Sequence, residues 1–263
     1  MADLTSTRAP NGATGVLVLA SGDILWGRGF GAEGAAVGEV CFNTAMTGYQ
    51  EVMTDPSYAG QIINFTFPHI GNVGTNAEDI EATNPHALGC IVRQDVTDPS
   101  NFRNTQHFVQ WMVQNGRIGL SGIDTRALTR LIRLKGAPNA VIAHNAKGQF
   151  DLAELLSQAR GWPGLEGMDL AKDVTTLQTY GWEDGLWKLG QGYGTPAKGR
   201  KKVVAIGWSQ GGGSTIAAAG QPALTKPKSP VMPVLTTADC GDPKQRNARL
   251  SALQSDKSWT TSA

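Results

Sequence analysis

The chain lacks most of the signals that mark a membrane protein, a secreted protein or a nucleic-acid binder. Its net charge is only +1 over 263 residues, so no strong electrostatic field points to nucleic acid or to an anionic membrane surface. No apolar run is long enough to cross a bilayer. Residues 1–14 have neither the basic start nor the apolar stretch of a secretory signal. We therefore predict a cytoplasmic protein with no nucleic-acid or membrane partner.

Cysteine and histidine are also scarce. The three cysteines, Cys41, Cys90 and Cys240, lie far apart and form no Cys-x-x-Cys pair, so we predict reduced thiols and no disulfide framework. The chain has four histidines, and none follows His144. The sequence after that residue therefore offers no histidine that could act as a catalytic base.

The composition is that of a globular protein with a sizeable core. Apolar residues make up 40% of the chain and charged residues 17%, and the length of 263 residues is enough for two ordinary domains. Apolar runs on either side of Ser21, Gly22 and Asp23 predict a β-hairpin. Further strands are predicted within residues 87–96 and 139–144.

Helix patterns lie between these predicted strands. Phe108, Trp111 and Met112 share one face of the first predicted helix. Asp124 is placed as the N-cap of the second, and residues 151–162 have the pattern of a third. Because strands and helices mix without a strict βαβ repeat, we predict an α+β domain and not a doubly wound sheet.

Shifts in composition predict four segments along the chain. A Gly- and Lys-rich stretch reads as a linker, and the sequence after it opens with an apolar strand and then loses regular patterning. We expect this last segment to be an incomplete, poorly ordered α/β remnant. The segments are a polar tail at 1–14, a first domain at 15–187, a linker at 188–202 and the remnant at 203–263.

The stretch from Phe42 to Asn76 is dense in Asn, Thr, Ser, Tyr, Gly and Pro. It mixes β-rich runs with turns at Thr47–Gly48 and Asp55–Ser57. Such turns present hydroxyls and amides close to the backbone. These groups can bind a small polar ligand, or they can simply cap turns. The residues alone leave both interpretations open.

The same stretch resembles the N-terminal domain of the small, glutamine-hydrolysing chain of carbamoyl phosphate synthetase. The resemblance continues through the motifs "SNFRNT", "GLSGIDTRALTRLIRLKGAPNAVI" and "GWPGLEGMDLAKDVTT" and covers about residues 15–187. It implies a layered β/β/α domain that packs against a large synthetase chain in a heterodimer. In that family the small chain supplies ammonia from glutamine. The large chain uses bicarbonate and ATP to make carbamoyl phosphate for arginine and pyrimidine biosynthesis.

The resemblance also implies roles for particular residues and cofactors. The serine of the family's "TDPSY" motif contacts bound glutamine, and it matches Ser57 here. A hydroxyl suits this task because it can donate to a carboxylate or accept from an ammonium group. ATP and Mg belong to the large chain in this family, so we expect no cofactor on this chain.

The resemblance stops after the strand at 203–206. The family continues there into a glutamine amidotransferase domain with a Gly-x-Cys-x-Gly elbow and a later His-x-Glu, and neither pattern occurs in this sequence. Cys240 sits in no such elbow, and a thiol nucleophile needs a base. We therefore predict no catalytic residue for glutamine hydrolysis in this sequence. The remaining role is that of a non-catalytic domain that docks on the large chain.

An alternative function is a serine hydrolase. The sequence "GWSQG" places Ser209 in a Gly-x-Ser-x-Gly pattern after a strand, which resembles the nucleophile elbow of α/β-hydrolases. That chemistry also needs a downstream acid and a histidine, and no histidine follows. Ser209 is therefore only a weak catalytic candidate. The resemblance to the synthetase small chain and the resemblance to an α/β-hydrolase both include the strand at 203–206. A chimera, a damaged reading frame or a truncation would each account for this overlap.

Two minor features have structural interpretations. His69 matches a family motif, and we predict a turn or core histidine with no metal because no second ligand lies nearby in the sequence. Arg126, Arg130 and Arg133 fall on one predicted helix. They could dock an acidic partner surface, or they could form an ordinary solvated face.

Overall fold

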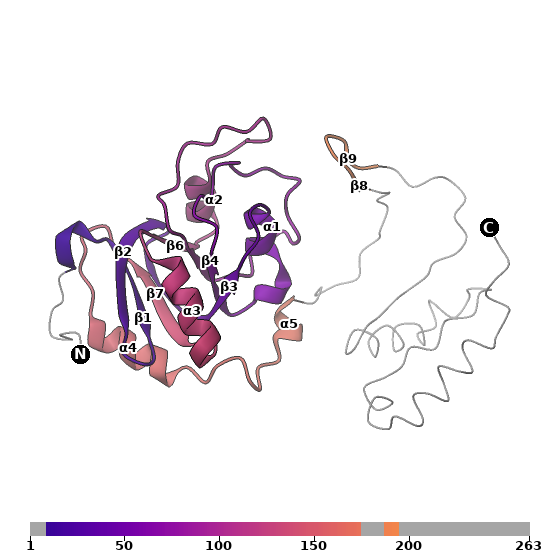
Figure 1. Ribbon diagram of the computed structural model, residues 1–263. Coiled ribbons are helices and arrows are strands. Elements are labelled where there is room, and N and C mark those ends of the chain that lie inside the picture. The colour runs from indigo at the N-terminus through magenta and orange to yellow at the C-terminus, as the bar shows by residue number, and fades with distance from the viewer. Residues whose placement is uncertain (1–8, 175–186, 195–263) are drawn as a thin grey trace, which may run out of the picture. The chain divides into compact units, whose positions relative to one another are not determined.

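The computed structural model describes residues 9–174 and 187–194 (Figure 1). The chain divides into two compact units, Met1–Thr179 and Tyr180–Ala263, which are described separately. The predicted remnant at 203–263, with Ser209 and Cys240, lies outside the described residues.

Seven strands of the first unit close into a barrel in the order β1-β2-β6-β5-β4-β3-β7. The neighbours β3, β4, β5 and β6 run parallel, and the other pairings are antiparallel. The carboxyl ends of four strands therefore meet at one end of the barrel, and the loops that follow them gather there. The strands are β1 (Gly15–Leu19), β2 (Ile24–Gly31), β3 (Gly34–Asn43), β4 (Gln61–Phe65), β5 (Gly89–Ile91), β6 (Ile118–Ser121) and β7 (Asn139–His144).

Helices and short 3₁₀ turns connect the strands (Figure 1). Aspartates start the two longest helices: Asp124 accepts a hydrogen bond from the backbone N–H of Ala127, and Asp151 accepts one from Glu154. The helices are α1 (Tyr49–Thr54), α2 (Phe108–Gln114), α3 (Thr125–Lys135), α4 (Leu152–Gly161) and α5 (Leu170–Val174), with 3₁₀ turns η1 (Pro10–Gly12) and η2 (Pro56–Tyr58).

Alternation along the strands produces three apolar clusters. Side chains on the inner face of the barrel form the first, which includes Leu17, Leu120 and Ile142 and also receives Leu128 and Ile132 from α3. On the outer face, α1 and α2 pack over β4 and β5, while α4 packs over β1 and β7. Leu128 and Ile132 thus form the apolar side of α3, which packs on the inner cluster.

A buried amide joins α3 to the sheet. Asn64 of β4 is fully buried, and its Nδ2 donates to the backbone oxygen of Thr125 at 3.0 Å and to the hydroxyl of Thr129 at 2.9 Å. These bonds hold the first turn of α3 beside β4. The opposite side of the helix is left facing solvent.

The α+β class is confirmed, and the sheet closes on itself. The hairpin around Gly22, the strand at 139–144 and the helices after Asp124 and Asp151 are confirmed, and Gly22 has the positive φ of 94° that the turn requires. One helix within residues 42–76 was not predicted from the sequence. Residues Tyr49–Thr54 form α1, because burying Tyr49 and Met53 on one side requires a helical turn.

A small hairpin lies in the second unit. Strands β8 (Trp187–Lys188) and β9 (Gly192–Tyr193) pair antiparallel, with Gly190 at a φ of 74° in the turn. The hairpin covers the start of the segment predicted as a linker. Across the described parts of the chain, no helix combines the length and the apolar character that crossing a bilayer requires.

Close strand contacts make some glycines sensitive to substitution. A Cβ at Gly38 of β3 would lie 2.6 Å from the backbone oxygen of Gly60, so Gly38→Ala should lower the free energy of unfolding by about 1–3 kcal/mol. Gly161, at the end of α4, has open space around its Cα. Gly161→Ala should be neutral or stabilising. Urea unfolding of the two variants checks this, and equal midpoints would contradict the tight β3–β4 packing.

Candidate functional site

Ser57 occupies the exposed apex of η2, immediately before β4. The carboxylate of Asp55 accepts a hydrogen bond from the Ser57 N–H at 2.8 Å, and Pro56 sets the first φ of the turn. Among the described residues, no group hydrogen bonds to the Ser57 hydroxyl. The "TDPSY" sequence therefore builds a turn that presents one free hydroxyl to solvent.

The neighbouring Tyr58 fixes this turn to the barrel. Its hydroxyl accepts a hydrogen bond from the side-chain amide of Asn43, at the carboxyl end of β3, over 3.1 Å. Its ring packs partly into the apolar cluster beneath α1 and α2. The position of Ser57 is thus set by contacts on both sides of the turn.

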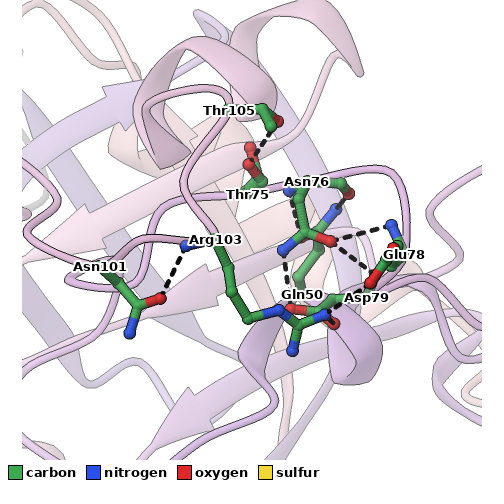
Figure 2. Close-up of polar contacts among 8 residues, drawn as sticks. All are labelled: Gln50, Thr75, Asn76, Glu78, Asp79, Asn101, Arg103 and Thr105. Carbon is green, nitrogen blue, oxygen red and sulfur yellow. Dashed lines mark hydrogen bonds and ion pairs between the residues drawn. The ribbon is translucent and has the colours of Figure 1, made fainter. Parts of the chain in front are cut away.

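A polar network holds α1 to the loops that follow β4 (Figure 2). The buried side chain of Gln50 donates to the backbone oxygen of Asn76 at 2.7 Å and accepts from its backbone N–H at 3.0 Å. One residue earlier, the hydroxyl of Tyr49 donates to the backbone oxygen of Gly74. Burial raises the pKa of that hydroxyl well above its ordinary value, so it stays a donor at neutral pH.

Arg103 joins a second loop to the same network. Its guanidinium donates to Asp79 at 2.6 Å and to Glu78 at 3.3 Å, and the Arg103 and Asp79 side chains are only 24% and 14% exposed. Asn76 completes the link because its Nδ2 donates to Asp79 at 2.8 Å. Figure 2 shows Arg103 reaching across from the loop of Asn101 to the loop of Asp79.

Backbone bonds reinforce this contact between the two loops. Thr75 and Gln106 form an isolated antiparallel bridge, and the hydroxyl of Thr105 donates to the backbone oxygen of Thr75 at 2.9 Å. We call the set Gln50, Thr75, Asn76, Glu78, Asp79, Arg103 and Thr105 the loop clamp. Its hydrogen bonds give Gln50, Thr75, Asn76 and Thr105 a structural role in joining the loops. Ser57 remains the ligand candidate.

The sequence did not reveal the loop clamp. The hydrogen bonds that join its separate segments connect side chains to partners 24 to 30 residues away, so no local spacing marks these contacts. The bonds of Asn76 to Glu78 and Asp79 are local. Arg103 lies between two asparagines in "SNFRNT", and that unusual density of turn residues was the available signal.

A smaller polar cluster lies where β5 and β6 end. Asp95 accepts hydrogen bonds from Arg28 at 2.8 Å and from the hydroxyl of Ser121 at 2.6 Å. These two donors hold the pKa of Asp95 below its ordinary value. The resulting stabilisation exists above the ordinary pKa of aspartate and disappears as the pH falls through the lowered one. It is small, because the Arg28 and Asp95 side chains are 57% and 61% exposed.

The described cysteines are poorly suited to nucleophilic chemistry. Burial, reinforced by the nearby charge of Glu39, raises the pKa of the Cys41 thiol to about 12. Burial also raises the pKa of Cys90. Both thiols are therefore protonated at neutral pH, and a protonated thiol is a weak nucleophile.

His69 follows β4 in an exposed turn. In the parts of the chain that the structure describes, no three His, Cys, Asp or Glu side chains come together as possible metal ligands. Neither Ser57 nor His69 lies in such a group. The Ser209 hydrolase hypothesis stays a sequence prediction, since that residue is outside the described range.

Removing Arg103 tests the loop clamp. Arg103→Met leaves the Asp79 carboxylate largely buried without its cation, and should lower the free energy of unfolding by about 1–3 kcal/mol. Arg28→Met removes an exposed ion pair and should cost less than about 1 kcal/mol. Urea midpoints measure both variants. A cost for Arg103→Met no larger than that for Arg28→Met would show that the clamp does not stabilise the domain.

Known proteins resemble the first unit closely. The family model described as carbamoyl-phosphate synthase small chain, CPSase domain, matches residues 17–142. The carbamoyl phosphate synthase small chain of Zymomonas mobilis is 66% identical over 177 residues, which cover 67% of this chain and 47% of that protein. The same-named chain of Bradyrhizobium diazoefficiens is 61% identical over 197 residues, 73% of this chain and 50% of that protein.

The match has a clear extent. The chain spans about half the length of the curated relatives it matches, and the matched half carries the closed barrel, the "TDPSY" turn and the loop clamp. The first unit of this chain is therefore an N-terminal domain of the carbamoyl phosphate synthase small-chain family.

Proposed function

We propose that these 263 residues act as a docking half of a carbamoyl phosphate synthase small chain: they bind the large chain and do not themselves release ammonia from glutamine. The observation that carries this proposal is the 66% identity to a named small chain over 177 residues. The family model matches residues 17–142, and the strands of this region belong to a sheet that closes into a barrel. The supporting sequence fact is that no Gly-x-Cys-x-Gly elbow occurs in the 263 residues.

The reaction proposed for the complete enzyme needs groups that this sequence does not provide. A cysteine thiolate would attack the glutamine amide, and a base would hold the thiol as thiolate. Cys41 is half-buried and Cys90 is buried, and burial keeps both thiols protonated. No histidine follows His144. ATP and Mg would act on the large chain, which would use the ammonia for carbamoyl phosphate, the precursor in arginine and pyrimidine biosynthesis.

Ser57 is the part of the glutamine site that we assign to this domain. Its exposed hydroxyl can donate to the carboxylate of glutamine or accept from its ammonium group. Asp55 and Tyr58 hold the turn, so the hydroxyl is presented in a fixed position. One hydroxyl on an open surface makes a weak site, because a single hydrogen bond contributes only about 0.5–1.5 kcal/mol net.

The finer architecture follows from the same assignment. We propose that the two walls of the barrel and the helices outside them correspond to the β/β/α layers of the family. We also propose that residues 203–263 are a remnant of an α/β domain and that the protein acts in the cytoplasm. Sequencing the region that encodes residues 188–263, and comparing it with related loci, tests the remnant.

An ammonia-release assay with and without a large chain tests the proposed function. The chain should co-purify with the carbamoyl phosphate synthase large chain of Zymomonas mobilis, chosen because the small chain of that organism is 66% identical here. It should release no ammonia from glutamine above background. The full-length small chain of that organism is the positive control. Ammonia release by this chain, or a failure to bind the large chain, would contradict the proposal.

Calorimetry tests the expectation that Ser57 alone forms only a weak glutamine site. Titration of the chain with glutamine should give no saturable heat below about millimolar concentration, which corresponds to about −4 kcal/mol. Ser57→Ala should therefore leave the titration unchanged. Micromolar binding that Ser57→Ala abolishes would overturn the view that this half of the site is weak alone.

A further inference from the structure

Two surfaces of opposite charge lie on the described part of the chain, and the first is the exposed side of α3. Arg126, Arg130, Arg133 and Lys135 are all exposed, and the three arginines follow the spacing i, i+4 and i+7 that places residues on one side of a helix. None of the four forms an ion pair with another described residue. We call these four residues the α3 basic face.

The stability of the helix does not account for these charges. Arg133 and Lys135 suit the negative end of the helix dipole, but Arg126 lies in the first turn, where a cation is unfavourable. Arg126 and Arg130 also repel each other at i, i+4 spacing. The positive charge is thus present at some cost to α3.

The second surface is formed by α1 and the loop after β4. Glu51 belongs to α1, and Glu78, Asp79 and Glu81 belong to the loop. The loop is fixed to the helix because the backbone N–H of Glu81 donates to the hydroxyl of Thr54 at 2.9 Å. We call these four carboxylates the acidic face.

Arg103 does not neutralise the acidic face. It pairs with Asp79 and Glu78, and one guanidinium among four ionised carboxylates leaves negative charge in excess. Burial raises the pKa of Glu51, and the charges of Asp79 and Glu81 raise it further against the opposing effect of Arg103. Glu51 therefore lies in a region of net negative charge.

The two faces lie on opposite sides of the sheet at β3 and β4. Leu128 and Ile132 of α3 pack on the inner cluster, whereas Tyr49 and Met53 of α1 pack on the outer cluster. Because the sheet separates the two helices, we infer that the opposite charges of one copy do not pair with each other. A second copy can supply the complementary charge to each face.

Exposed apolar side chains accompany both faces. Leu134 of α3 is 81% exposed, and Ile80, which lies between Asp79 and Glu81 in the sequence, is 40% exposed. An apolar contact surrounded by polar groups is typical of protein interfaces, and arginine is enriched in them. The net charge of the whole chain is only +1, so two copies meet without strong overall repulsion.

We propose that this chain associates with a second copy of itself, the α3 basic face of one copy contacting the acidic face of the next. Charge complementarity selects this occupant, and the inference does not depend on binding to a large chain. Each copy uses two different surfaces, so the contact is head to tail and can continue beyond a dimer or close into a ring. The eleven residues of α3 span only about 16 Å, which makes the contact small and the association weak.

Sedimentation equilibrium of the full chain tests the association itself. At low NaCl concentration the weight-average mass should rise with protein concentration and pass that of a dimer. Raising the NaCl concentration should lower it, because salt screens attraction between exposed charges. A wild-type chain that stays monomeric under both conditions would overturn the proposal.

Reciprocal charge reversals test which surfaces meet. Arg130→Glu and Glu81→Lys should each weaken the association by about tenfold or more, because each replaces an attraction by a repulsion. The double variant should associate again, since a glutamate of one copy then faces a lysine of the next. Lys147→Glu changes the charge as Arg130→Glu does, at an exposed site after β7, and should alter the association less than about twofold.

The double variant decides between this pairing and others. Thermal unfolding of the single variants should match that of the wild type, because Arg130 and Glu81 are exposed. If Arg130→Glu weakens the association but Glu81→Lys does not, or if the double variant fails to recover, the α3 basic face contacts some other surface and the proposal is wrong. Equal association of all variants would likewise contradict it.

Discussion

Closure of the sheet is the constraint on which the rest of the domain depends. β1 pairs with both β2 and β7, and β7 also pairs with β3, so each of the seven barrel strands has two partners. An unpaired strand edge is a template for aggregation, and a closed barrel removes it. Glycines permit the close approach: Gly15 lies against Gly29, whose own Cα faces the ring of His144. The barrel therefore satisfies its backbone without help from any other domain.

The order of the strands in the closed barrel also determines where the polar loops lie. The parallel order of β3 to β6 sends successive loops to one end of the barrel, where the loop clamp joins them through Asp79 and Arg103. Some polar side chains of the family-like motifs, among them Gln50, Asn76 and Arg103, are used in that support. Among the described residues, the exposed hydroxyl of Ser57 is one group that these bonds leave free for contact with another molecule. In the proposed function this domain binds and positions, and the described cysteines, both protonated at neutral pH, do not supply the nucleophile for glutamine hydrolysis.

The sequence predicted elements whose signals are local. Asp124 and Asp151 mark helix starts, and the turn at Gly22 marks a hairpin, because a cap or a turn needs only neighbouring residues. The six-residue helix α1 was missed, since it is too short for a helical period to be recognised. Barrel closure was not predictable because strand pairing joins residues far apart in the chain. Ser57 was proposed from family resemblance, and its surroundings could be described only from the structure.

Hydrogen exchange on the full chain tests most directly whether the closed barrel is a unit complete in itself. If it is, the amides of β1 and β7, the strands that close the sheet, should exchange as slowly as those of the central strand β4, all at the rate of global unfolding. If Leu17 and Ile142, which pair across that closure, exchange early while β4 stays protected, the barrel opens in the isolated chain. The domain would then depend on a partner for its fold.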